Sequence, residues 1–400
     1  MLQPNISEAG ADEDILAVPL GRDFPEIRDA VAAICKKYPG AYWRDLEDRR
    51  EYPHDFVKEL GDAGYLAALI PQEFGGAGLP LRAGSVILEE IHASGCMASH
   101  CHAQMYMMEM LLRHGNAEQK TRYLHEIAAN RLRFQSFGVT EPTTGSDTPR
   151  LKTRAVRNGD HYVVNGQKVF TSRARQSDLM TLLVRTTPIE EVKRRTDGLS
   201  VLLVDMREAK GLTIRPIDTM VNHQTNEVFF HDMRVPIANL IGEEGEGFHY
   251  ILDGMNAERI LVAAESLGDA RYFIDRAVKY ASERIVFGRP IGQNQGIQFP
   301  IARAYAEYRG ADLMVRTAAA LFAAGRRCGE EANLARMMAA DAAWNAGEAC
   351  MQTHGGYAAA REYDIERKWR SARIQRIAPV STNLILAYLG HKVLGMPKSY

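Results

Sequence analysis

The stretch FGVTEPTTGSD, residues 137–147, lies where the pattern of the chain changes from helical to strand-like. Residues 23–132, before it, carry apolar side chains at helical spacing. From about residue 133 to 242, short β-rich runs such as HYVVNGQKVF (161–170) and LSVLLVDM (199–206) alternate with turn residues. No helix of useful length separates these runs, so we expect an antiparallel sheet that forms a barrel or a sandwich.

Helical periodicity returns after Gly245-Glu246-Gly247 and continues to the end of the chain. Residues 253–288 are predicted to form one long helix, followed by helical segments at 299–325 and 333–356. We therefore expect an α+β protein. Its expected parts are an N-terminal tail (1–22), an N-terminal helical domain (23–132), a middle antiparallel β-barrel or sandwich domain (133–242) and a C-terminal domain resembling a four-helix bundle (243–400).

Residues 89–115, EEIHASGCMASHCHAQMYMMEMLLRHG, carry apolar side chains on more than one face, which predicts a largely buried helix. Gly115 is expected to end this helix, and Asn116 to cap the next one.

The bulk composition is that of an ordinary globular protein. The 400 residues are 46% hydrophobic and 25% charged, and the net charge of −1, with no basic block, argues against a nucleic-acid partner. No apolar run approaches the roughly 18–20 residues needed to span a bilayer, so membrane insertion is not expected. The N-terminus lacks the pattern of a secretory signal, and the C-terminal tripeptide KSY is not the peroxisomal address. We expect a cytoplasmic protein.

The five cysteines show no paired spacing, and their odd number argues against a disulfide framework. One cluster contains Cys96, His100, Cys101 and His102. On a helix only Cys96 and His100 share a face, and two ligands do not make a zinc site, so no metal is expected. No G-x-G-x-x-G lies between a strand and a helix, which removes the usual dinucleotide signature.

Four stretches in this order resemble the motifs of the acyl-CoA dehydrogenase family, over about residues 25–395. They are FGVTEPTTGSD (137–147), VVNGQKVFTSR (163–173), RIVFGRPIGQNQ (284–295) and MQTHGGYAAAREYDIERKWRSAR (351–373). Each could arise by chance, but the ordered set is specific. The resemblance implies the three-domain fold above, an FAD cofactor, an acyl-CoA substrate, and electron transfer to an electron-transfer flavoprotein. It also implies a homotetramer or homodimer.

By position, several residues resemble the flavin contacts of the family. Thr140 and Ser172 are small hydroxyl residues at strand ends that suit the flavin's pyrimidine edge and N5, and Phe170 stands where many members have Trp. Arg284 suits a pyrophosphate, because a guanidinium binds two oxygens in one plane. The full expected set is Phe137, Val139, Thr140, Phe170, Ser172, Arg284, Phe287, Gln295, Gln352, Gly355, Gly356, Ser381 and Asn383. Because Arg284 and Phe287 resemble residues that reach a neighbouring subunit's flavin, the cofactor site is expected to be shared between chains.

The catalytic base is not where most family members carry it. Dehydrogenation between Cα and Cβ needs a carboxylate for the α-proton, donors for the enolate-like oxygen, and flavin N5 as hydride acceptor. The frequent base position falls in ARIQRIAPVSTNLI (372–385), at Pro379, which cannot serve. In a subset that includes the isovaleryl-CoA and long-chain enzymes, the glutamate precedes an arginine on the first long helix of the C-terminal domain. Glu258-Arg259 matches that site, so Glu258 is the expected base.

The resemblance also indicates substrate contacts. Ser146 resembles the residue that holds the pantetheine arm, and Asn256 and Arg259 lie where the family contacts the thioester or CoA. The helix at about 96–112 is expected to form the floor of the acyl pocket, with Ser99 and His102 toward it. These polar groups favour short, branched or polar acyl chains, a carboxylated chain among them.

Two other functions fit the same fold. One is a flavin oxidase or monooxygenase acting on a substrate without CoA, which Ser146 and Arg259 argue against. The other is a non-catalytic flavin-binding protein of the DNA-associated kind, which the near-neutral charge argues against.

Overall fold

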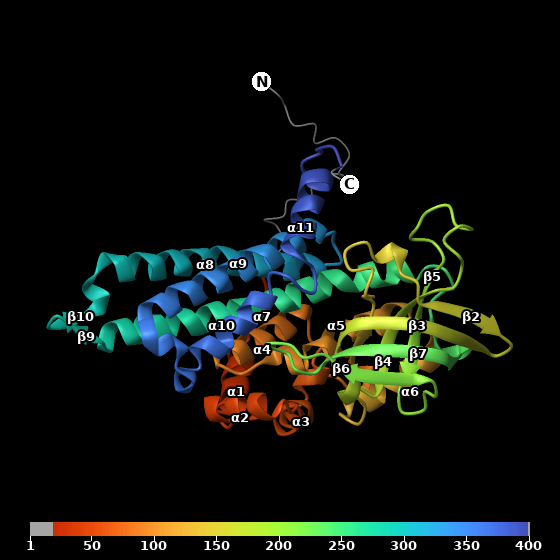
Figure 1. Ribbon diagram of the computed structural model, residues 1–400, viewed down its shortest axis with the longest axis horizontal. Coiled ribbons are helices and arrows are strands. Elements are labelled where there is room, and N and C mark those ends of the chain that lie inside the picture. The colour runs from red at the N-terminus through yellow and green to blue at the C-terminus, as the bar shows by residue number, and fades with distance from the viewer. Residues whose placement is uncertain (1–18, 399–400) are drawn as a thin grey trace.

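The computed structural model describes residues 19–398. Most of the expected N-terminal tail, and two residues of the C-terminal tripeptide, therefore lie outside the described part. Figure 1 shows helices, then a sheet, then a second set of helices in chain order. The expected α+β fold class is confirmed. Across residues 19–398, no helix combines the length and the apolar character needed to cross a bilayer.

The N-terminal region is helical. Its helices are α1 Pro25–Cys35, α2 Gly40–Arg49, α3 His54–Asp62, α4 Leu81–Ala93, α5 His102–His114 and α6 Ala117–Ala128. As predicted, α5 ends before Gly115, and Asn116 caps α6: its side chain accepts from the backbone N–H of Gln119 at 2.8 Å.

The single helix expected over residues 89–115 is wrong. α4 ends at Ala93, a short 3-10 turn covers Ala98–His100, and α5 begins at His102. Gly95 has a left-handed backbone (φ 85°) and lies so close to Tyr272 that an added Cβ would be 3.0 Å from the ring.

Buried cations stabilise this break. The Arg367 guanidinium donates to the carbonyl of Gly95 at 2.9 Å, and Lys368 Nζ donates to that of Cys96 at 3.0 Å. Both donors lie 272 residues further along the chain. Carbonyls that a continuous helix would pair internally are therefore paired by a distant element.

The middle region is one sheet whose strands follow the order β6-β7-β3-β2-β4-β5-β8, with β1 paired to β4. The strands are β1 Phe134–Gly138, β2 Arg154–Asn158, β3 His161–Ser172, β4 Leu179–Arg185, β5 Leu199–Asp205, β6 Leu212–Pro216, β7 Thr225–Pro236 and β8 Leu240–Ile241. The pairs are mostly antiparallel, but β1 runs parallel to β4, which departs from the purely antiparallel expectation. β2 and β3 lie between these two strands in the sequence, so the chain has room to cross over.

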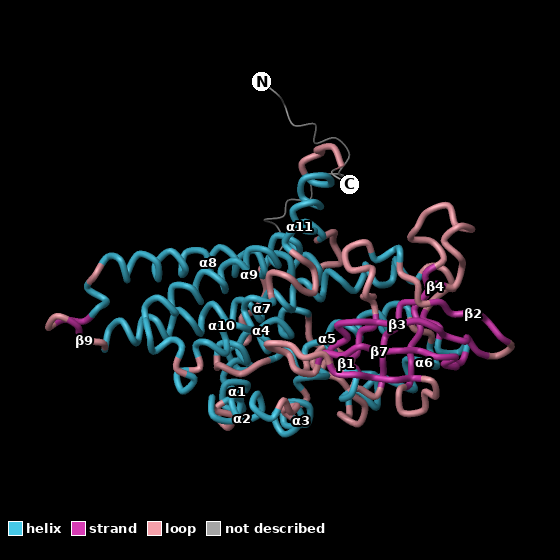
Figure 2. Tube along the Cα trace, in the orientation of Figure 1, coloured by secondary structure: helices cyan, strands magenta, loops and turns pink. Residues whose placement is uncertain are grey.

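β4 and β5 are buried along their whole length because both faces of the sheet are covered. Leu183 and Leu203 belong to the core shared with the helices, whereas Leu182 and Val204 belong to a second core inside the β domain. Figure 2 shows the strands of this sheet gathered at one end of the molecule, beside α5 and α6, with β9 at the opposite end.

The C-terminal region is built on one long helix. Its elements are α7 Gly247–Glu283, the two short strands β9 Ile285–Val286 and β10 Arg289–Pro290, α8 Gln295–Ala323, α9 Gly329–His354, α10 Ile365–Ile374 and α11 Thr382–Tyr388. α7 covers the predicted long helix except for residues 284–288, where the chain leaves the helix and forms β9. It has 37 residues, so it is about 55 Å long. It runs from the sheet to the β9–β10 tip (Figure 1) and packs on α4, α5, α8 and α9.

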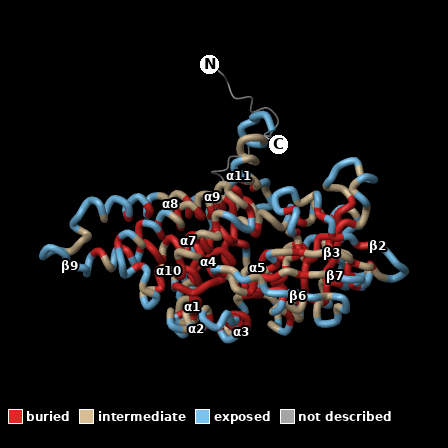
Figure 3. Tube along the Cα trace, in the orientation of Figure 1, coloured by how far each residue is buried: buried red, intermediate tan, exposed pale blue. Residues whose placement is uncertain are grey.

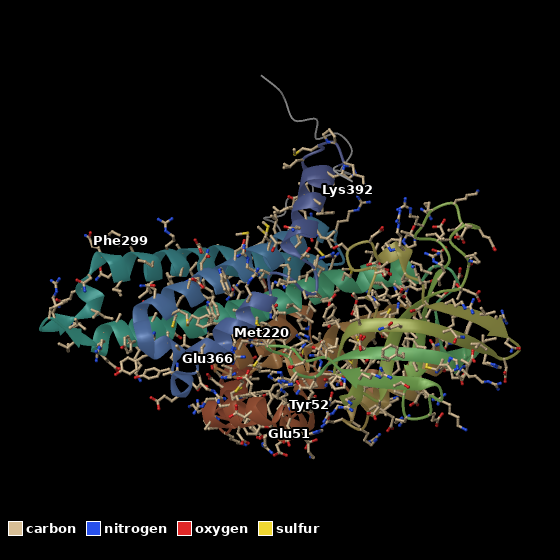
Figure 4. All side chains as sticks on the ribbon, in the orientation of Figure 1. Glu51, Tyr52, Met220, Phe299, Glu366 and Lys392 are labelled. Atoms are coloured by element: carbon tan, nitrogen blue, oxygen red, sulfur yellow. The ribbon has the colours of Figure 1, made fainter. Side chains whose placement is uncertain are left out.

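The centre of α7, with α4 and α5 beside it, forms the most buried part of the molecule (Figure 3). α11 and the described residues after it, up to 398 and including Lys392, project away from this body (Figure 4). The catalytic candidates lie in the buried centre, close to the sheet.

Candidate active site

Glu258 lies on α7 with only 3% of its surface exposed. Burial raises the pKa of its carboxyl to about 7, although Arg259, Arg336 and the Tyr106 hydroxyl favour the charged form. Tyr106 reaches this position from α5. Glu258 is therefore a buried carboxylate that titrates close to neutral pH.

Arg336, on α9, connects Glu258 to the segment that contains Pro379. Its guanidinium is 1% exposed and donates to the carbonyl of Ala378 at 2.8 Å and to the side chain of Gln375 at 3.2 Å. Burial lowers the pKa of Arg336 to about 10, against the attraction of Glu265 and Glu258. The two possible base positions, far apart in sequence, thus share one buried cation.

A second carboxylate, Glu265, follows two turns after Glu258 on α7. His102 Nδ1 lies 2.5 Å from its Oε1, and Gln375 donates to its Oε2 at 3.4 Å. Burial acts to raise the pKa of Glu265, but His102 and His92 outweigh it, so the pKa lies below its ordinary value. Glu265 therefore stays ionised at neutral pH, whereas Glu258 is present there in both its protonated and its ionised form.

A buried ionic cluster lies next to these side chains, one turn further along α7. Asp269, one turn beyond Glu265, lies 2.5 Å from Lys368 Nζ and 2.9 Å from His92 Nδ1. The other imidazole nitrogen of His92 accepts from the backbone N–H of Ala98 at 3.1 Å. Because these groups also fix the turn before α5, they set the position of His102.

A buried ion pair joins the two parts of the sheet that carry the expected flavin contacts. Lys168 Nζ lies 2.9 Å from Glu141 and donates to the carbonyl of Val139 at 3.0 Å. Glu141 also accepts from the backbone N–H groups of Lys152 and Thr153 at 2.7 and 2.9 Å. The motifs FGVTEPTTGSD and VVNGQKVFTSR are thus joined through one lysine and one glutamate.

Around this pair, the expected contacts lie at and just beyond the C-terminal ends of β1 and β3. The carbonyl of Thr140 accepts from Val169 N at 2.9 Å, and Ser172 Oγ accepts from Asn222 at 2.9 Å. Phe137 is half-buried, and Phe170 is 63% exposed with a left-handed backbone (φ 57°). An exposed aromatic ring beside hydroxyl and backbone groups fits the face and polar edge of a flavin.

The expected adenine-side residues form a separate group at the far end of α7. Arg284, Gln352, Gly355 and Gly356 line one pocket of about 550 Å³, and Arg284 lies over the ring of Tyr357 at 5.9 Å. A Cβ added at either glycine would meet nothing within 4 Å, so the backbone is open to a ligand. This open, cationic pocket fits the pyrophosphate and adenosine part of FAD.

Two other expected contacts lie close to that pocket but do not line it. Phe287 is 100% exposed at the β9–β10 tip, and Gln295 is the exposed first residue of α8. Arg284 is 26 residues beyond Glu258, or about 39 Å along α7. The expected adenine-side group is therefore remote from Glu258 of its own chain.

Expected substrate contacts divide between two places. Arg259 donates to Asn256 at 2.9 Å beside Glu258, and its Nε is buried without a partner. The Ser99 hydroxyl is also buried without a partner. Ser146, in contrast, is exposed on the loop after Gly145.

The last two expected flavin contacts begin α11. Ser381 Oγ accepts from the backbone N–H of Leu384 at 3.3 Å as the helix cap, and Asn383 is exposed.

Four side chains of the site were not expected from the sequence: Tyr106, Arg173, Glu265 and Arg336. Glu265 follows Glu258 by seven residues, which places both on one helix face, and Arg336 is a lone cation in an alanine-rich helix. These two patterns are signals in the sequence that point to Glu265 and Arg336 as site residues. Tyr106 and Arg173 carry none that separates them from ordinary core and turn residues.

No metal site emerges from the cysteine and histidine cluster. The five cysteines are free and buried, and within residues 19–398 no three His, Cys, Asp or Glu side chains are grouped as metal ligands.

Comparison with known proteins agrees with this geometry. Models of the acyl-CoA dehydrogenase N-terminal, middle and C-terminal domains match residues 23–131, 136–233 and 245–385. Acyl-CoA dehydrogenase FadE12 of Mycobacterium tuberculosis is 32% identical over 385 residues, covering 94% of this chain and 96% of its own.

Two solved structures are similar over nearly the whole chain. A glutaryl-coenzyme A dehydrogenase in complex with glutaryl-CoA has a TM-score of 0.89 at 26% identity, covering 95% of this chain and 97% of its own. A structure from work on the electron transferring flavoprotein of Acidaminococcus fermentans has a TM-score of 0.88 at 29% identity, covering 94% and 99%. The predicted family, enzyme class and cofactor are confirmed: the chain belongs to the acyl-CoA dehydrogenase family of FAD-dependent oxidoreductases.

Proposed function

We propose that this enzyme converts an acyl-CoA thioester to the 2-enoyl-CoA, with Glu258 as the base that removes the α-proton. The observation that carries the proposal is the buried Glu258 carboxyl with its pKa raised to about 7 by desolvation. A base whose pKa lies near working pH is both available in its ionised form and strong enough to accept a carbon acid's proton. The protein thus belongs to the subset with the glutamate on α7.

FAD, when bound, supplies the acceptor for the β-hydride. We assign its ring to the strand ends formed by Phe137, Val139, Thr140, Phe170 and Ser172. Ser381 and Asn383, at the start of α11, are assigned to the same cofactor. Two supports for this assignment are the exposed Phe170 ring and the polar groups of Ser172 and Thr140 beside it.

The adenine-side pocket is proposed to serve the FAD of a neighbouring chain. Its distance from Glu258, about 39 Å along α7, supports this division. The exposed Phe287 at the tip gives the neighbour an apolar contact. The functional unit is then a homotetramer or homodimer, with Gln295 and Gln352 on the same side as Arg284.

On the substrate side, Ser146 is assigned to the pantetheine arm and Asn256 with Arg259 to the thioester end. Ser99 and His102 lie toward the acyl pocket, so short, branched or polar acyl chains are favoured over long straight ones. Electron-transfer flavoprotein is the proposed acceptor, supported by the similar structure from Acidaminococcus fermentans.

An anaerobic titration with a panel of acyl-CoA thioesters tests the proposal. Bleaching of the flavin by at least one thioester, followed by reoxidation by electron-transfer flavoprotein, is expected. If no thioester reduces the flavin, or if reduced enzyme consumes oxygen rapidly and ignores the flavoprotein, the proposal fails.

A further inference from the structure

Arg173 is a buried cation that the proposed reaction does not use. It follows Ser172 at the end of β3, has a left-handed backbone (φ 57°) and is 4% exposed. Its Nε is buried without a partner, and Nη2 lies 3.5 Å from His102 Nε2. Among residues 19–398, no carboxylate forms an ion pair with this guanidinium.

The buried carboxylate of Glu265 lies on the other side of His102 from Arg173. Glu265 is ionised and lies 2.5 Å from His102 Nδ1, so Nδ1 carries the proton and donates. His102 Nε2 is then an acceptor that faces the guanidinium of Arg173. The imidazole fixes the orientation of Arg173 but cannot cancel its charge.

Neither buried carboxylate of this region is paired with Arg173. Glu265 and Glu258 both attract Arg336, whose Nε and Nη1 are buried without partners. Burying a cation without its own counter-ion is costly, unless a ligand supplies the missing charge.

Arg173 is also separated from Glu258 by a distance that an acyl chain can span. His102 and Tyr106 lie one turn apart on α5, about 6 Å. Glu265 and Glu258, which these two side chains contact, lie about 10 Å apart along α7. An acyl chain whose α-carbon is at Glu258 would bring a group several carbons further on toward His102 and Arg173.

We infer that Arg173, oriented by His102 and Glu265, binds a carboxylate at the far end of the acyl chain, so that the substrates are ω-carboxyacyl-CoA thioesters. This inference rests on the proposed function and names its substrate class. The unpartnered Nε, together with the second N–H of Nη2, can offer two parallel donors to a carboxylate. The buried Ser99 hydroxyl, three residues before His102, offers a further donor in this part of the pocket.

Paired substrates of equal chain length test the inference with the holoenzyme. We expect kcat/KM for adipoyl-CoA to exceed that for hexanoyl-CoA by at least about tenfold, because hexanoyl-CoA has no carboxylate to make the charged contact with Arg173. Arg173→Met should lower kcat/KM for adipoyl-CoA by about 30-fold to 1000-fold, with little change for hexanoyl-CoA. Arg173→Lys, which keeps the charge, should retain part of the preference.

Arg175→Met is the matched control, because Arg175 is an exposed cation two residues away. It should behave as wild type. FAD content is measured in each variant, because Ser172 is adjacent to Arg173. Pimeloyl-CoA against heptanoyl-CoA, and glutaryl-CoA against pentanoyl-CoA, give the preferred spacing.

The outcomes separate the two proposals. Flavin reduction by hexanoyl-CoA that equals or exceeds reduction by adipoyl-CoA, across all chain lengths, overturns the inference and leaves the proposed function standing. An equal loss on both substrates in an FAD-replete Arg173→Met overturns it as well. Failure of every thioester to reduce the flavin overturns the proposed function itself. If Arg173→Met does not fold, the inference is tested by the paired carboxylated and uncarboxylated thioesters on the wild-type enzyme.

Discussion

Glu258 and Glu265 occupy one face of α7, two turns apart, and their surroundings move their pKa values in opposite directions. Burial raises the pKa of Glu258 to about 7, whereas His102 and His92 outweigh burial at Glu265 and keep its pKa below the usual value. Two carboxylates on one helix therefore take different roles: one exchanges a proton near neutral pH, and the other stays a fixed negative charge.

Glu258→Gln should abolish most turnover without disturbing the cofactor. Glutamine keeps the size and hydrogen bonding of the side chain but cannot accept the α-proton, so the rate of flavin reduction should fall by about 10²–10⁴-fold. FAD content and acyl-CoA binding should match wild type, which spectral titration would show. Flavin reduction at a near wild-type rate would rule Glu258 out as the base.

The pH dependence of kcat/KM should report the same carboxyl. Only the ionised form of Glu258 can act as base, so kcat/KM should rise as pH increases through about 7 and then level off. Because burial is the main cause of the raised pKa, the midpoint should depend little on salt. A rate that is flat from pH 5 to pH 8, measured with a slow substrate, would contradict this assignment.

A relocated base should restore part of the activity. Arg336 contacts the carbonyl of Ala378 and attracts Glu258, so position 379 lies beside the same buried cation. Glu258→Gly combined with Pro379→Glu is expected to exceed Glu258→Gly alone in kcat, while staying below wild type. The single variant Pro379→Glu serves as the control for damage to the segment. No gain in the double variant, with FAD content intact, would place the two positions on different sides of the substrate.

Arg284→Ala should lower FAD content and loosen assembly together, since Arg284 is proposed to bind the cofactor of a neighbouring chain. Absorbance gives the FAD ratio, and sedimentation gives the oligomeric state. Arg157→Ala, which removes an exposed cation from β2, is the control and should change neither. A monomeric Arg284→Ala with full FAD would refute the shared site.

The sequence was sufficient for the order of domains and for most of the helix α7, because these depend on local periodicity and contiguous motifs. It also singled out Glu258, which the structure places in a buried position and whose role as base stays a prediction. It failed at residues 94–101, where the turn depends on Arg367 and Lys368 from the other end of the chain. A helical pattern contains no information about such partners. Arg173 was missed for a similar reason, since only the folded chain brings it to His102 and leaves it without a counter-ion.

The parallel pairing of β1 with β4 shows the same limit. Each strand can be recognised from its own residues, but the partner of a strand is set by the packing of the whole sheet. The elements were therefore predicted more accurately than their connections.

The length of α7 has a genetic consequence. The helix carries Glu258 near one end and leads to Arg284 at the other. In the proposed shared site, the two residues of one chain therefore belong to different active sites. A chain lacking Glu258 and a chain lacking Arg284 are each defective. In a mixed oligomer, however, some active sites combine Arg284 of the first chain with Glu258 of the second, and these sites are intact. Co-expressing the two defective alleles should then yield active enzyme by intragenic complementation, which neither allele gives alone.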